Sequence, residues 1–222
     1  MNKYAAEFIG TFALVFCGTG AAIIDQDTNG VITHFGVAIT FGLIVMSMIY
    51  TLGHISGCHI NPAVTIAFTI ARRFKIKEML PYIISQLAGA FLASVALTYL
   101  FPHNNTLGAT LPSGTVLQSF VFEFILTFFL MLVIIKVATG SNEKGMFAGL
   151  AIGAMVFLEA MFAGPVSGAS MNPARSIAPA VVSGHIESLW IYIAAPIFGA
   201  AAAIPVCTFL NSKNNQDENS PV

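Results

Sequence analysis

Two segments of this 222-residue chain repeat one another within an otherwise apolar sequence. GHISGCHINPAVTIA at residues 53–67 and GPVSGASMNPARSIA at residues 164–178 align without a gap and share Gly, Ser, Gly, Asn, Pro, Ala, Ile and Ala at matched positions. Asn is a preferred N-cap, and Pro is favoured at the first position of a helix. Each copy therefore predicts a helix that starts inside a hydrophobic region. The two helix-start triplets are Asn61, Pro62, Ala63 and Asn172, Pro173, Ala174.

The composition indicates an integral membrane protein. Hydrophobic residues make up 56% of the chain and charged residues only 9%, and about 20 apolar residues are enough to cross a bilayer. The first apolar stretch also resembles a secretory signal peptide, but Glu7 interrupts it and it has a counterpart in the second half of the chain, so we interpret it as a span. The six predicted spans are residues 4–24, 33–53, 79–101, 118–138, 146–162 and 188–210.

The basic residues predict the orientation in the membrane, because Lys and Arg accumulate on the cytoplasmic side. Alternating spans place nearly all of them on one side, whereas the loops of the opposite side carry Asp, Glu and His, with Arg175 as the exception. We therefore expect a multi-pass protein of the plasma or inner membrane with both termini in the cytoplasm, and no nucleic-acid partner. The basic residues of the cytoplasmic side are Lys3, Arg72, Arg73, Lys75, Lys77, Lys136, Lys144 and Lys213.

The repeat extends beyond the two segments. AEFIGTF at residues 6–12 matches FEFILTF at 122–128, and LAGA at 87–90 matches IFGA at 197–200. The halves, about 4–101 and 118–210, each contain three spans, so the second half enters the membrane from the opposite side as an inverted repeat. We predict one domain over residues 1–210 and a disordered cytoplasmic tail over the polar residues 211–222.

Each Asn-Pro-Ala triplet starts an apolar stretch, 63–70 or 174–182, that is long enough for half a bilayer. The Gly-rich strips before the triplets are not regular helix throughout, and irregular backbone at membrane depth is tolerated only beside protein or a water-filled cavity. We therefore expect two re-entrant half-helices and two strips whose backbone carbonyls line a pore. Those carbonyls belong to Gly57, Cys58, His59, Ile60, Gly168, Ala169, Ser170 and Met171.

Two Asn-Pro-Ala triplets in an inverted repeat of six spans resemble the aquaporin, or major intrinsic protein, family over nearly all of residues 4–210. The resemblance implies an all-α membrane fold with six transmembrane helices and two half-helices, and a passive channel with no cofactor and no enzymatic activity. It implies a homotetramer in the lipid bilayer. It also implies that Asn61 and Asn172 donate hydrogen bonds to the permeating molecule where two positive helix ends repel cations and protons.

Arg175 follows the second triplet directly, where the first half has Val64. A buried arginine must face a cavity and be hydrogen-bonded, and in the family it belongs to a four-residue constriction. By the same resemblance the other three members are Phe41, Ala160 and Ala169. Water-selective relatives carry His at the position of Ala160, so we expect a wider, more apolar filter.

Residues around the second triplet bear on the range of solutes. Glycerol-selective relatives have Asp and a basic residue where this chain has Ser176 and Ala180, and the sequence around them, together with Tyr192 and Ile193, resembles the nodulin-like branch and its bacterial relatives. We rank glycerol-type polyols, metalloid acids or urea, together with water, ahead of a strict water channel. An ion-coupled secondary transporter is the alternative of another class, but the midplane residues here are neutral Asn.

Three acidic residues lie within the spans. Glu7 and Glu123 are matched across the repeat, and the resemblance implies that they support the strips by accepting backbone N–H groups. Glu159 has no counterpart, and two roles stay open for it: a bond to a neighbouring helix, or an influence on the entry of cationic solutes. We expect no metal site at His54 and His59, and no disulfide framework from three cysteines, of which Cys58 either borders the pore or packs in the core.

Overall fold

The computed structural model describes residues 2–138 and 145–217, and all of their regular structure is α-helical. Two helices are short, and each begins at the proline of an Asn-Pro-Ala triplet: α3 (Pro62–Ile70) and α8 (Pro173–Ser183). The long helices are α1 (Asn2–Asp27), α2 (Thr33–Ser56), α4 (Ile76–Leu100), α5 (Val116–Ala138), α7 (Ala148–Ser167) and α9 (Ile191–Asp217).

The six long helices are the predicted spans. Each is long and apolar enough to cross a membrane, which confirms the all-α membrane fold. The two helices that lead into the strips continue further than predicted, α2 to Ser56 and α7 to Ser167. Each stops where a glycine, Gly57 or Gly168, adopts a left-handed conformation and donates its N–H to the carbonyl four residues earlier. The irregular strips are therefore shorter than the repeated segments and begin at these glycines.

Helix α7 passes through Pro165, which has no N–H to donate to the carbonyl of Met161. The side chain of His34 in α2 supplies the missing donor, because its Nε2 lies 2.6 Å from that carbonyl oxygen. This bond explains how the helix tolerates a proline.

The last helix, α9, continues to Asp217, although we predicted that a disordered tail starts at residue 211. A helix that is already nucleated gains one hydrogen bond for every residue it adds, so a polar segment can extend it. Residues 218–222 of the predicted tail, and Lys144 among the predicted cytoplasmic basic residues, lie outside the described residues.

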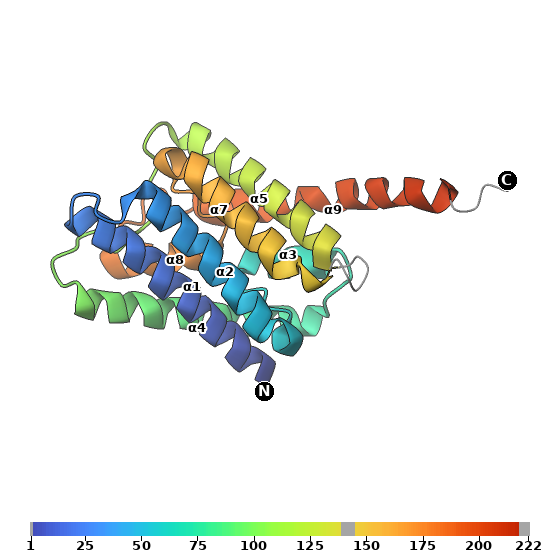
Figure 1. Cartoon of the computed structure of the whole chain (residues 1–222), viewed down its shortest axis with the longest axis horizontal. Coiled ribbons are helices and arrows are strands. Elements are labelled where there is room, and N and C mark those ends of the chain that lie inside the picture. Colours follow the sequence, from blue (N-terminus) through green and yellow to red (C-terminus); the bar gives the residue numbers. More distant parts are fainter. Residues whose placement is uncertain (1, 139–144, 218–222) are drawn as a thin grey trace.

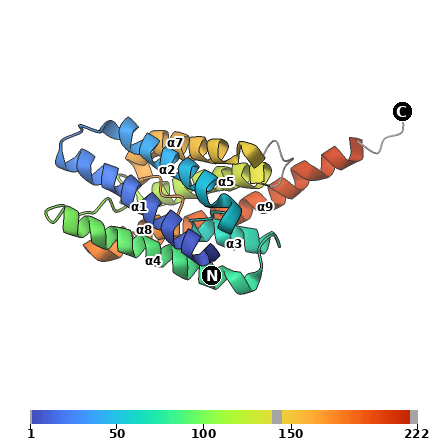
Figure 2. The same cartoon turned by 60° about the horizontal axis from the view of Figure 1, so that its bottom comes forward.

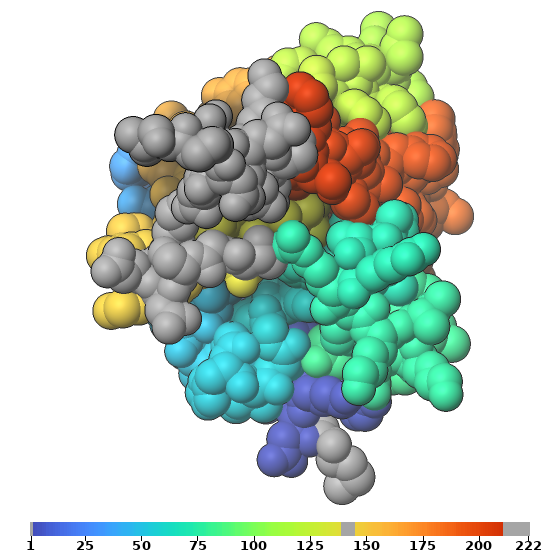
Figure 3. All heavy atoms as spheres, turned by 90° about the vertical axis from the view of Figure 1, so that its right-hand side faces the viewer, coloured from blue at the N-terminus to red at the C-terminus, as the bar shows by residue number. Residues whose placement is uncertain are grey.

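The helices form two bundles that pack against each other. Helix α1 packs on α2 and α4, α5 packs on α7 and α9, and α2 packs on α7 between the bundles (Figures 1 and 2). The short helices α3 and α8 lie in the interior of the assembly, and each contacts both α4 and α9. The N-terminus, the turn after α3 and the end of α2 lie at one end of the molecule, and α9 projects from that end (Figure 3). At this end the Lys3 ammonium lies 2.8 Å from the Glu78 carboxylate.

Glycines set the distance between the paired helices. A Cβ atom on Gly89 of α4 would lie 2.2 Å from the carbonyl oxygen of Phe8 in α1, and one on Gly199 of α9 would lie 2.1 Å from that of Phe124 in α5. These are matched positions of the two halves. Because the neighbour is backbone in both cases, the helices would have to separate to accept a side chain.

Gly89→Ala should therefore lower the free energy of unfolding by at least about 2 kcal/mol, the cost of forcing an extra methyl into a packed interior. The matched control is Gly53→Ala in α2, whose new Cβ would meet only the Ile49 side chain at 3.9 Å. Thermal unfolding of both variants in detergent, followed by circular dichroism, tests the expectation. Equal transition temperatures for the two variants would contradict it.

Candidate functional site

The two half-helices begin opposite one another at the centre of the molecule. Asn61 caps α3 by accepting the N–H of Ala63 at 2.9 Å, and Asn172 caps α8 by accepting the N–H of Ala174 at 3.0 Å. Proline follows each cap, as in the predicted helix starts. At about 1.5 Å per residue, the 9-residue α3 and the 11-residue α8 each reach about half the thickness of a bilayer.

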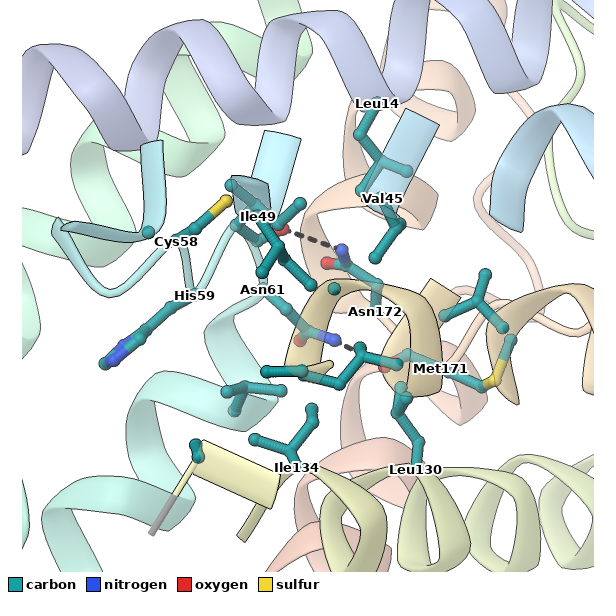
Figure 4. Close-up of a pocket in the computed structure, with 18 of the residues that line it drawn as sticks. Leu14, Val45, Ile49, Cys58, His59, Asn61, Leu130, Ile134, Met171 and Asn172 are labelled. Atoms are coloured by element: carbon teal, nitrogen blue, oxygen red, sulfur yellow. Dashed lines mark hydrogen bonds between the residues drawn. The ribbon is translucent and has the colours of Figure 1, made fainter. Parts of the chain in front are cut away.

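The caps also join the two halves of the protein. The Nδ2 of Asn61 donates to the carbonyl of Met171 at 2.8 Å, and the Nδ2 of Asn172 donates to the carbonyl of Ile60 at 2.8 Å (Figure 4). Each amide NH2 has two hydrogens, so one donor of each Asn is used in this reciprocal pair and the second is left for another acceptor. Both side chains line a cavity of about 430 Å³, the larger of two cavities described below.

The strips before the caps have the same unusual backbone. Residues 57, 58 and 60 of the first strip and the matched residues 168, 169 and 171 of the second have positive φ. Left-handed residues in such a strip turn successive N–H groups toward one side, where they form a concave binding site for an anion. The carbonyls that accept from the Asn side chains belong to these strips. Seven of the eight residues whose carbonyls we expected along a pore line the larger cavity, and the eighth, Gly168, lines the smaller one.

A buried glutamate binds the N–H groups of each strip. Glu7 of α1 accepts from the N–H groups of His59 and Ile60 at 2.9 and 2.7 Å, and also from the Ser56 hydroxyl and the Gln86 amide. Glu123 of α5 accepts from the N–H groups of Ser170 and Met171 at 2.9 and 2.8 Å, and from the Ser167 hydroxyl. Both carboxylates are fully buried. The structure thus has the contacts that we expected of the two matched glutamates.

Two cavities lie along the centre of the protein. The larger, of about 430 Å³, includes the Asn pair in its wall and reaches Tyr50 and His54 near the end of α2. The smaller, of about 240 Å³, lies beside the segment between α4 and α5. Among the residues described, four line both cavities and therefore form the boundary between them. They are Phe41, Ala160, Ala169 and Arg175, the four residues of the predicted filter.

Arg175 is held in place at this boundary. Its Nη1 donates to the carbonyl of Gly108 at 2.8 Å, and its guanidinium lies 5.0 Å from the centre of the Phe41 ring, within range of a cation–π contact. The side chain is 6% exposed. Its charge is thus directed to the cavity boundary by one carbonyl and one aromatic face.

The role of Gly108 was not predicted from the sequence. Gly108 lies in the segment that joins the two halves, and a second contact ties this segment to α8: the Thr110 hydroxyl lies 2.7 Å from that of Ser176. The Ser176 hydroxyl also meets the hydroxyl of Ser170 in the second strip. No motif marks the segment, so only the unpaired guanidinium of Arg175 could have indicated that an acceptor was needed.

Glu159 lies next to Ala160 in sequence but lines neither cavity. It is 1% exposed, and neither carboxylate oxygen has a hydrogen-bond partner in the described part of the chain. The bond to a neighbouring helix that we considered is therefore absent among these residues.

Cys58 lines the larger cavity, while the ring of His59 lies beside the Thr65 hydroxyl and stacks on Phe68. In Figure 4 the His59 ring points away from the Asn pair.

Two capped half-helices that meet within a bundle of six apolar helices, with cavities on both sides of a boundary of four residues, define a transmembrane channel. The sequence profile described as "Major intrinsic protein" matches residues 1–206. The chain belongs to the major intrinsic protein family, whose members are channels for water and small solutes, and it is therefore not an enzyme.

Individual relatives support the same assignment. The chain is 49% identical to nodulin-26 of Glycine max over 203 residues, which cover 91% of this chain and 75% of the relative. It is 50% identical to aquaporin NIP1-1 of Oryza sativa over 204 residues, 91% of this chain and 72% of the relative. Its fold is similar to the X-ray structure of the aquaglyceroporin from Plasmodium falciparum, with a TM-score of 0.82, 25% identity and coverage of 95% and 98% of the two chains.

The two buried glutamates with different surroundings allow a matched stability test. Glu123→Met should lower the free energy of unfolding by at least about 3 kcal/mol, because it leaves three buried donors without an acceptor. Glu159→Met removes a buried polar group with no described partner and should raise the free energy of unfolding by about 1–2 kcal/mol. Unfolding of both variants in detergent, compared with the unmodified protein, measures the two changes. A loss of similar size in both would show that Glu159 also has a partner.

Proposed function

We propose that this channel conducts small neutral solutes of the glycerol type, and urea or metalloid acids, together with water, and that it excludes protons and ions. The observation that carries the proposal is the boundary between the cavities. Two of its four side chains, Ala160 and Ala169, are methyl groups, so the constriction beside Phe41 and Arg175 is wider and more apolar than one with a histidine at residue 160. A glycerol molecule can place its carbon backbone against the Phe41 ring while its hydroxyls accept from Arg175.

The exclusion of cations follows from positive charge at two levels of the pore, the Asn pair and the boundary between the cavities. The N-termini of α3 and α8, each equivalent to about half a positive charge, meet at the Asn pair. Arg175 adds a full positive charge at the cavity boundary. A cation that has lost its hydration meets both barriers, whereas a neutral solute meets donors at Asn61, Asn172 and Arg175 and acceptors along the strips.

A strict water channel is the second candidate within the family, and it would need a narrower boundary than two alanines provide. An ion-coupled transporter would need a charged or unwound cation site at the midplane, where this chain has the neutral Asn61 and Asn172. Solute uptake that saturates and depends on a proton or sodium gradient would favour the transporter instead.

We infer further that both termini are cytoplasmic, in the plasma or inner membrane, and that the protein is a homotetramer. The end of the molecule that carries Lys3 and the basic residues between α3 and α4 supports this orientation by the positive-inside rule. The accessibility of an N-terminal tag in intact cells tests the orientation, and chemical cross-linking in the membrane tests the tetramer.

Ala160→His should suppress glycerol permeability by at least about tenfold and water permeability much less, because the imidazole narrows the boundary and adds a polar contact. Stopped-flow light scattering on vesicles with the purified protein measures both permeabilities. The matched control is Ala148→His, which places the same side chain in the wall of the larger cavity away from the boundary and should leave the ratio of the two permeabilities unchanged. The proposal of a wide filter is wrong if the unmodified protein passes water but neither glycerol, urea nor a metalloid acid.

A further inference from the structure

Gly18 of α1 lies directly behind the ring of Phe41. Gly18 is buried and lines neither cavity, whereas Phe41 lines both. A Cβ atom on Gly18 would lie 2.1 Å from Cε1, 2.4 Å from Cδ1 and 2.5 Å from Cζ of Phe41. Three atoms of the ring thus occupy the space that the smallest side chain would need, and the ring lies against bare helix backbone.

The ring has a second neighbour on the side of the pore. The guanidinium of Arg175 lies 5.0 Å from the ring centre, so the ring stands between the backbone of α1 and the charged group at the boundary. Carbon atoms pack at about 3.5–4.0 Å, so a methyl group at residue 18 would displace the ring by roughly 1 Å or more. Because α1 blocks the ring from behind, the displacement is directed into the opening between the cavities.

Helix formation does not explain a glycine at this position, since Ala is the better helix former. Two residues further along the same helix, a Cβ on Gly20 would meet the Leu97 side chain at 3.4 Å, an ordinary contact. Not every glycine of α1 has such a close approach, and at Gly18 the neighbour that causes it is a residue of the boundary.

We propose that Gly18 is a specificity-determining residue of the channel. Gly18 has no Cβ atom, so the Phe41 ring can lie against the backbone of α1 and away from the pore. The position of the ring then determines the size of the largest neutral solute that passes. The inference rests on the proposed role of Phe41 in the filter. Gly18 itself does not contact the solute.

The test is a double-mutant cycle of Gly18→Ala and Phe41→Val, with Gly20→Ala as the matched control on α1. Valine has none of the three ring atoms that lie within 2.5 Å of the position a methyl group on residue 18 would take, so the conflict disappears in the Phe41→Val background. Purified variants in lipid vesicles are compared for water, urea and glycerol permeability by stopped-flow light scattering, at equal amounts of folded protein.

Gly18→Ala should lower the ratio of glycerol to water permeability by about tenfold, and Gly20→Ala should leave it unchanged. In the Phe41→Val background, adding Gly18→Ala should have no further effect. An unchanged ratio in Gly18→Ala, or an equal loss in both backgrounds, overturns the inference. If Gly18→Ala alone does not fold, recovery of folded protein in the double variant supports the contact, and failure to recover it rejects the contact.

The test also separates this inference from the proposed solute range. If the unmodified protein passes water alone, the proposal of a wide filter is wrong, and the inference about Gly18 is then decided by water permeability. That permeability should fall in Gly18→Ala and should not fall further when Gly18→Ala is added to Phe41→Val.

Discussion

The structure depends on the bonds between two buried glutamates and the backbone of the two strips. Hydrocarbon offers no water to irregular backbone, so every N–H group that a strip leaves outside a helix needs an acceptor within the protein. Glu7 and Glu123 each supply one carboxylate for two successive N–H groups. The carboxylates take donors of each strip and no acceptor, so the carbonyls stay available to other donors, and residues of both strips line the larger cavity.

The same bonds fix the half-helices. The N–H groups of Ile60 and Met171, bound by the glutamates, immediately precede the caps Asn61 and Asn172. The carbonyls of Ile60 and Met171 in turn accept from the cap of the opposite half. One residue of each strip therefore connects a helix of its own half to the cap of the other half, and the two positive helix ends are held together although they repel each other. Positive φ at these two residues, which normally costs about 1–3 kcal/mol, is retained because both the donor and the acceptor of each are used.

The sequence predicted the features that depend on local chemistry. Apolar length predicted the six spans, and Asn before Pro predicted the helix starts at Pro62 and Pro173 within one residue. It did not predict that α7 continues through Pro165, because the donor that compensates for the proline is His34 in another helix. It did not predict Gly108 either, since a backbone carbonyl has no side chain that could mark it as the acceptor for Arg175. The surroundings of Glu159 likewise depend on packing between helices, which a single sequence does not record.

The two halves share a backbone but are supported differently. In the first half Gln86 of α4 donates both to Glu7 and to the Thr65 hydroxyl. Helix α4 thus stabilises the glutamate that binds the first strip. The matched residue in the second half is Pro196, which has no such donor, and Ser176, the counterpart of Thr65, instead meets Thr110.

The second strip and Arg175 are thus braced by the segment that joins the halves, which lies outside the repeat. A change in that segment alters the support of Arg175 and, through Ser176, of the second strip, whereas the first strip is held by Glu7 of α1, to which Gln86 of α4 donates. The two strips are therefore held by different contacts, so the support of Arg175 at the cavity boundary can change while that of the first strip is kept.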